Sequence, residues 1–91
     1  MEINQRTLCY VIFGIVYKPM TYQEIEYTLG LRQFSVSRER LRKTLKLLCD
    51  CGYCYRHGNR FFNCLYPDLF AIDRRAQHEV LTQMDQDERL Q

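Results

Sequence analysis

A chain of 91 residues, 46% hydrophobic and 26% charged, has the size and composition of one small globular domain. Its longest apolar stretch, residues 8–17, is only about half as long as a membrane-spanning helix and lacks the features of a signal peptide. These properties argue against a membrane protein or an exported one, and they favour a cytoplasmic location.

The net charge of +2 conceals an asymmetry along the chain. The stretch from Arg32 to Arg60 holds eight Lys and Arg residues against Glu39 and Asp50, a balance of +6. The remaining residues hold five positive and nine negative side chains, a balance of −4. A concentrated positive charge is typical of a surface that binds nucleic acid or an acidic partner, although a solvated helix face can also carry such a run.

The five cysteines are an odd number and follow no secretory signal, so we expect them to be reduced. The spacing of Cys49, Cys51 and Cys54, with His57 and Cys64 nearby, raises a small zinc module as a weaker alternative. Zinc knuckles usually present C-x2-C pairs on turns, whereas Cys49 and Cys51 fall on the last turn of an expected helix. We therefore expect no metal and no other cofactor.

Two helices are predicted in the first third of the chain. Residues 4–17 carry apolar side chains at helical spacing, and Pro19 ends this segment. Thr21 and Glu24 then match a capping box, which predicts a second helix with Ile25 and Leu29 turned inward. Gly30 is expected to form the left-handed cap at its end.

A third helix is predicted after the turn at residues 31–34. Ser35 or Ser37 can cap it, and Gly52 ends it. One face is apolar and the other strongly basic. The apolar stripe consists of Leu41, Leu45 and Leu48, widened by Leu47.

Two short aromatic segments, residues 53–56 and 61–64, then predict a hairpin joined by a four-residue link from His57 to Arg60. A final helix is expected over residues 68–89, with residues 85–91 polar and frayed. Its apolar residues are Leu69, Ile72, Ala76, Val80 and Met84 on the inward face, with Phe70 and Leu81 to one side.

With this order of elements, residues 3–65 resemble a winged helix-turn-helix domain of the kind found in small phage, bacterial and archaeal transcription regulators. The likeness rests on TYQEI at residues 21–25, on LRKTLKLLCDCGYCYR at residues 41–56, and on the wing at residues 57–62. It implies a mainly α fold with a small β-hairpin (α+β). The winged domain would occupy residues 1–66, and residues 67–91 would form a C-terminal helix, a possible dimerisation element.

The resemblance implies that the third helix enters the major groove of double-stranded DNA and that the wing meets the adjacent backbone or minor groove. Three of the residues implied to contact DNA also have structural explanations. Arg38 and Glu39 can form ion pairs within the protein, and His57 can be a simple turn residue. The implied contact residues are Arg32, Ser35, Ser37, Arg38, Glu39, Arg40, Arg42, Lys43 and Lys46, with Arg56, His57, Asn59 and Arg60 in the wing.

The expected function is sequence-specific regulation of transcription by a homodimer that contacts DNA. The alternative is a winged-helix adaptor whose basic face binds an acidic surface of a host protein, such as RNA polymerase or a nuclease. An enzyme is not expected, because neither His57 nor His78 has an evident catalytic partner and no glycine-rich phosphate loop is present.

Overall fold

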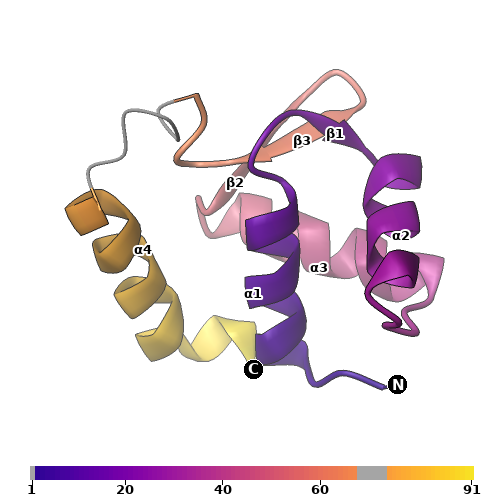
Figure 1. The fold of residues 1–91 in the computed structure, drawn as a ribbon. Helices are drawn as coiled ribbons and strands as arrows, with labels where there is room; N and C mark the ends of the chain where they lie inside the picture. Colours follow the sequence, from indigo (N-terminus) through magenta and orange to yellow (C-terminus); the bar gives the residue numbers. More distant parts are fainter. Residues whose placement is uncertain (1, 68–73) are drawn as a thin grey trace.

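The computed structural model describes residues 2–67 and 74–91. Its elements are α1 Gln5–Ile15, β1 Met20–Thr21, α2 Tyr22–Leu31, α3 Arg38–Asp50, β2 Cys54–His57, β3 Arg60–Asn63, α4 Arg74–Gln86 and the 3-10 turn η2 Glu88–Leu90. In Figure 1, α1 stands between α2 and α4, with α3 behind it and the sheet above. The predicted α+β class is confirmed: the described helices accompany a small three-stranded antiparallel sheet that includes the β2–β3 hairpin, and α4 follows the hairpin near the C-terminus.

Side chains cap the starts of the first two helices, and the capping box predicted for the second is present. Asn4 caps α1 by accepting a hydrogen bond from the Thr7 amide at 2.9 Å. At α2, the Thr21 hydroxyl accepts from the Glu24 amide and the Glu24 carboxylate accepts from the Thr21 amide, both at 3.3 Å. Free amides at both helix starts are thereby satisfied, and Ile25 is held in the core.

The prediction of a left-handed cap at Gly30 was wrong. Gly30 lies inside α2, and the left-handed residue is Gln33, with φ 63°. The Phe34 amide donates to the Leu29 carbonyl and the Gln33 amide to the Gly30 carbonyl, both at 3.0 Å, which is the Schellman pattern of helix termination. Because Phe34 packs against the core, the chain turns three residues later than the glycine suggested.

The third helix is anchored as the leucine stripe predicted. Leu41, Leu45 and Leu48 are buried, and Ser37 rather than Ser35 is the N-cap. Gly52 has φ +81° and ends the helix in a second Schellman motif, with the Tyr53 amide donating to the Leu48 carbonyl at 2.9 Å. The apolar face of α3 is therefore fixed to the core, which leaves the opposite face to solvent.

The sheet is larger than predicted by one strand, and its turn is shorter. The strand order is β1-β3-β2, all antiparallel, with Met20 opposite Phe61. The predicted four-residue link is wrong, because His57 and Arg60 form the last strand pair and only Gly58 and Asn59 remain in the turn. Gly58, with φ 62°, supplies the left-handed conformation at the first turn position. A strand as short as β1 shows no alternation in the sequence that could reveal it.

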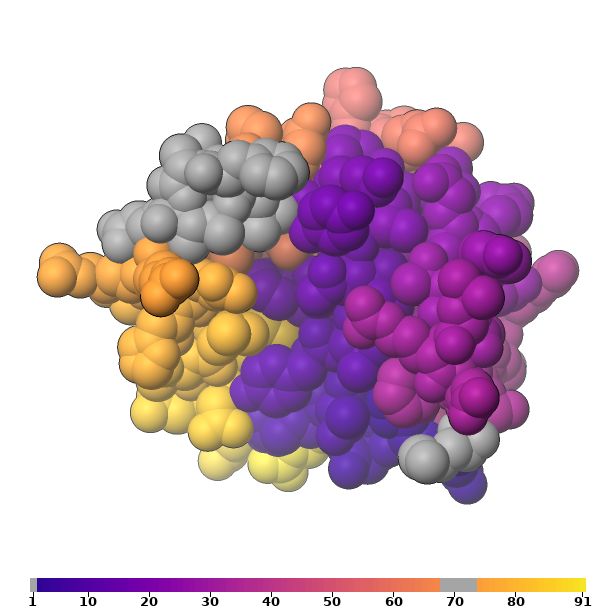
Figure 2. All heavy atoms as spheres, in the orientation of Figure 1, coloured from indigo at the N-terminus to yellow at the C-terminus, as the bar shows by residue number. Residues whose placement is uncertain are grey.

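The C-terminal segment closes the core of the same domain. In the ribbon and the space-filling view α4 lies against α1, on the side away from α2 (Figures 1 and 2). Met84 of α4 and Leu90 of η2 are fully buried, whereas Val80 and Leu81 are partly buried. The described helix ends at Gln86, before the predicted Arg89. Its predicted start at Asp68, together with Leu69, Phe70 and Ile72, lies outside the described residues.

The predicted fraying of residues 85–91 was also wrong, because polar contacts fix this segment. The Arg6 guanidinium on α1 donates to the carbonyls of Met84 and Asp85 at 2.8 Å and to that of Asp87 at 3.1 Å. The Tyr53 hydroxyl donates to the Asp87 carboxylate at 2.7 Å. This bond and burial raise the pKa of Tyr53 to about 12, with burial the larger cause.

Within residues 2–67 and 74–91, none of the helices combines the length and apolar character needed to cross a bilayer.

Candidate nucleic-acid interface

The outer face of α3 carries four basic side chains in solvent. Arg38, Lys43 and Lys46 expose 81%, 76% and 77% of their side chains, and Arg42 is also exposed. Lys43 and Lys46, three positions apart, lie on the side of the helix opposite the buried leucines, whereas Arg38 and Arg42, one turn apart, lie toward one edge of that side. The helix therefore presents a basic ridge on a backbone that the core holds in place.

Both lysines of α3 form ion pairs along the helix. Lys43 lies 3.1 Å from Glu39 and Lys46 lies 2.9 Å from Asp50, both at i,i+4 spacing. The hydrogen bond to Asp50 raises the pKa of Lys46. Exposed pairs of this kind contribute little to stability, so a phosphate can displace the carboxylate at small cost. Glu39 thus forms an ion pair with the lysine one turn later, as its structural explanation predicts.

Arg38 and Arg40 engage other parts of the fold. The Arg38 guanidinium lies 3.2 Å from the Glu26 carboxylate of α2, at the surface. Arg40 is half-buried and donates to the Ile3 carbonyl before α1. Arg40 therefore ties the N-terminal segment to α3, and it is the least available of the predicted contact residues on this helix.

The predicted wing residues surround the turn between β2 and β3. Arg56 donates to the Gly58 carbonyl at 2.7 Å and lies over the Phe61 ring, with its guanidinium carbon 5.5 Å from the ring centroid. Arg60 lies 3.2 Å from the Glu24 carboxylate, whereas His57 and Asn59 are exposed. Glu24 has its pKa lowered chiefly by its hydrogen bonds with Thr21 and less by Arg60, so one carboxylate both caps α2 and braces the wing.

The loop before α3 spans residues 32–37 and carries the remaining predicted contacts. Arg32 and Ser35 are exposed, while Phe34 and Val36 are partly buried against the core. The Ser37 hydroxyl accepts from the Arg40 amide at 3.1 Å. Ser37 is thus used as a helix cap, whereas Ser35 and Arg32 lie at the surface on an anchored loop.

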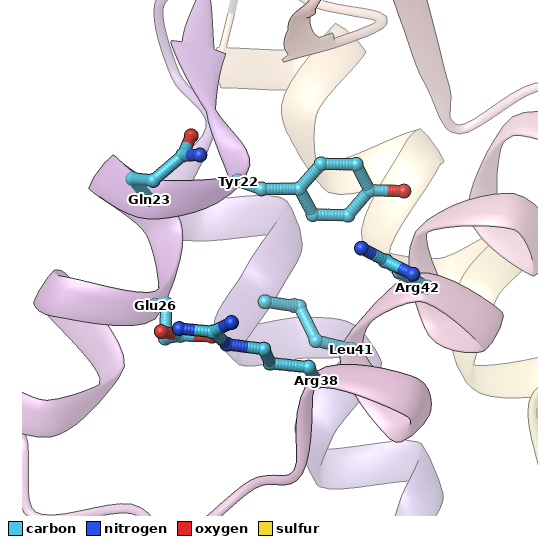
Figure 3. A pocket seen from close by; sticks show the side chains of 6 residues that line it. All are labelled: Tyr22, Gln23, Glu26, Arg38, Leu41 and Arg42. Carbon is cyan, nitrogen blue, oxygen red and sulfur yellow. The ribbon is translucent and has the colours of Figure 1, made fainter.

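A small cleft opens between α2 and the start of α3 (Figure 3). Its volume is about 130 Å³. In Figure 3, Arg38 and Arg42 enter it from α3, and the Tyr22 ring extends over the Arg42 guanidinium from α2. The residues that line it are Tyr22, Gln23, Glu26, Arg38, Leu41 and Arg42.

The cysteines do not assemble a metal site in the described part of the chain. No group of three or more potential ligands among His, Cys, Asp and Glu occurs within residues 2–67 and 74–91. Cys54 and Cys9 are buried, and burial raises the pKa of both thiols, that of Cys9 to about 11. Protonated, buried thiols are poor ligands and poor nucleophiles.

Reasoning from the sequence placed most of the basic residues on one helix and one hairpin but missed their partners on α2. Glu26 and Glu24 neutralise part of the positive face by pairing with Arg38 and Arg60. Tyr22 of α2 also lines the surface cleft. Helical periodicity within α2 shows which residues are polar, but only the packing of α2 beside α3 and the wing brings these groups together.

Comparisons with known proteins give no relative: no family model, no curated protein and no solved structure matches this chain.

Proposed function

We propose that this protein binds double-stranded DNA in a sequence-specific way and regulates transcription. Helix α3 would enter the major groove with its first turns at the base edges, and the β2–β3 wing would lie on the adjacent backbone or minor groove. Such a regulator would act in the cytoplasm. No cofactor is required for this binding.

The observation that carries the proposal is the basic outer face of a rigidly anchored helix. Arg38, Lys43 and Lys46 each expose about three-quarters or more of the side chain, while Leu41, Leu45 and Leu48 are at most 2% exposed. A helix held in this way can present cations to phosphates without moving its backbone, and a groove about 12 Å wide admits such a helix. Arg56 and Arg60 add positive charge in the wing.

A matched pair of charge-removing variants tests the proposal. Lys43→Ala with Lys46→Ala removes two positive charges from α3, and Arg74→Ala with Arg75→Ala removes two exposed positive charges from α4. In a gel shift, we expect the α3 variant to bind random-sequence duplexes more weakly by a factor of about ten or more. Each phosphate contact that is lost reduces the number of counterions released on binding. We expect the α4 variant to bind as the wild type does. Equal binding by all three proteins would contradict the proposal.

A homodimer formed through the C-terminal helix remains a prediction, suited to a palindromic site. Met84, one of the residues predicted for the inward face of that helix, is already buried within the monomer. A dimer contact would therefore draw on Val80 and Leu81, which are partly buried. Analytical ultracentrifugation of the free protein and of its DNA complex measures the stoichiometry directly.

The adaptor alternative has the basic face bind an acidic surface of a host protein, and an apolar surface on α2 would add to such a contact. Tyr27 and Leu31, one turn apart on α2, expose 69% and 66% of their surface and border a shallow hollow. An exposed apolar pair suits a protein partner better than a phosphate backbone. If the adaptor reading holds, Tyr27→Ser with Leu31→Ser abolishes capture of a host protein and leaves DNA binding unchanged. If the DNA reading alone holds, wild type and variant capture no partner.

A further inference from the structure

The arginines at the start of α3 do not have equal freedom to meet a ligand. Arg40 is bound to the Ile3 carbonyl and Arg38 to the Glu26 carboxylate. Arg42 is exposed, and its guanidinium makes no hydrogen bond to any residue in the described ranges. Among the three, Arg42 alone has none of its guanidinium donors in a hydrogen bond to the described residues.

Arg42 is nevertheless held in place by an aromatic ring. Its guanidinium carbon lies 5.8 Å from the centroid of the Tyr22 ring, which is within the range of a cation–π contact. In Figure 3 the guanidinium lies below the hydroxyl end of the ring, among the side chains that line the cleft between α2 and α3. A contact with the ring face restrains the long side chain while leaving the hydrogen-bonding edge of the guanidinium unoccupied.

The Tyr22 ring is itself braced by the sheet. Tyr22 meets Phe61 of β3 edge to face, with centroids 4.9 Å apart and planes at 67°. Phe61 is buried and lies opposite Arg56 in the strand register, with the Arg56 guanidinium over its ring. The side chains of Arg42, Tyr22, Phe61 and Arg56 thus form one contact chain from the recognition helix to the wing. The direction in which Arg42 points is fixed by the packing of three elements.

We propose that Arg42 is the guanine-reading residue of this protein and that Tyr22 is the positioning residue that holds it. This inference rests on the proposed binding of double-stranded DNA. Guanine offers two acceptors, O6 and N7, side by side in the major groove, and the planar fork of arginine matches both. Arg38 would then contact a phosphate of the DNA backbone, because a phosphate replaces the Glu26 carboxylate more readily than a base edge does.

The experiment starts from the duplex that the wild-type protein selects from a random DNA library. That duplex is synthesised with 7-deazaguanine in place of each guanine in turn, which removes the N7 acceptor and leaves base pairing intact. Binding of wild type, Arg42→Ala, Tyr22→Leu, Tyr22→Phe and Arg38→Ala is measured by fluorescence anisotropy. Thermal unfolding of each variant confirms that it is folded.

We expect one guanine in each half-site at which 7-deazaguanine weakens wild-type binding about tenfold, within the range for one bidentate pair. The penalty should vanish in Arg42→Ala, fall to about threefold or less in Tyr22→Leu, and persist in Tyr22→Phe and Arg38→Ala. A purely structural role for Tyr22 would lower stability but leave this ratio unchanged.

Three results would overturn the inference while leaving DNA binding intact. The selected duplex could lack a guanine at which N7 matters, Arg42→Ala could keep the full penalty, or Tyr22→Leu could keep it while folded. A wild-type protein that selects no sequence at all would instead defeat the proposed function. The two failures are therefore distinguishable.

Discussion

Replacing Arg40 should destabilise the protein, although the sequence groups this residue with the DNA contacts. Arg40 is half-buried, and its guanidinium donates to the Ile3 carbonyl across 37 positions of sequence. A hydrogen bond from a charged group contributes about 1.5–3 kcal/mol, and partial exposure of this one places its loss near the lower end. We therefore expect Arg40→Ala to cost about 1.5 kcal/mol, or about 6–12 °C in Tm for a domain of this size.

The matched control is Arg42→Ala, two residues later on the same helix. Arg42 is exposed and its guanidinium lies over the Tyr22 ring, so its loss should cost about 0.5–1 kcal/mol or less. Thermal unfolding followed by circular dichroism measures both variants, and anisotropy with duplex DNA measures binding. Arg40→Ala should lose more stability, and Arg42→Ala more DNA affinity.

The reasoning fails if the two variants exchange these roles. A wild-type Tm for Arg40→Ala would mean that the bond to Ile3 contributes nothing. An equal loss of stability in both variants would mean that position on the helix face, rather than the contact to the N-terminal segment, determines the cost.

Three further predictions concern the fold and its pH dependence. Gly52→Ala should lower the free energy of unfolding by about 1–2 kcal/mol, because φ is +81° there, although no atom obstructs the added methyl group. Gly30→Ala, inside α2, should raise it by up to about 1 kcal/mol, and urea unfolding measures both changes. Asn63→Ala should cost about 2–3 kcal/mol in the same assay, because it leaves the Phe13 carbonyl and the Leu65 amide unpaired, while exposed Asn59→Ala should cost little. Hydrogen bonds from Arg89, and to a lesser extent from Tyr53, lower the pKa of Asp87. The ionised carboxylate therefore stabilises the folded state above the ordinary carboxyl pKa, and this stabilisation is lost as pH falls below about 4. Asp87→Asn should flatten the decline of Tm in acid.

Local signals predicted the parts of the fold whose causes lie within a few residues. The Thr21 and Glu24 capping box, the leucine stripe of α3 and the stop at Gly52 each depend on neighbours in one helix. Gly30 resembled Gly52 in the sequence, yet Gln33 took the left-handed conformation because Phe34 is drawn to the core. Residue type alone does not decide between two such caps, since the deciding contact is tertiary.

The parts that sequence reasoning missed depend on contacts between distant segments. Leu90 lies in a polar stretch but is fully buried, because Arg6 and Tyr53 draw the last residues onto the domain. For the candidate site, the resemblance drawn from the sequence named Arg40 and Arg42 alike as DNA contacts. The packing of the N-terminal segment places the Ile3 carbonyl beside Arg40, and the packing of α2 places the Tyr22 ring beside Arg42.

The salt dependence of duplex binding tests the central claim most directly. Anisotropy titrations of a random-sequence duplex across about 50–200 mM salt give the slope of log affinity against log salt. If α3 and the wing neutralise about six phosphates, that slope is near −5, and it becomes shallower by about 2 when Lys43 and Lys46 are both replaced by alanine. Binding that does not change with salt, or a slope unaltered by the double replacement, would contradict the assignment of this face to DNA.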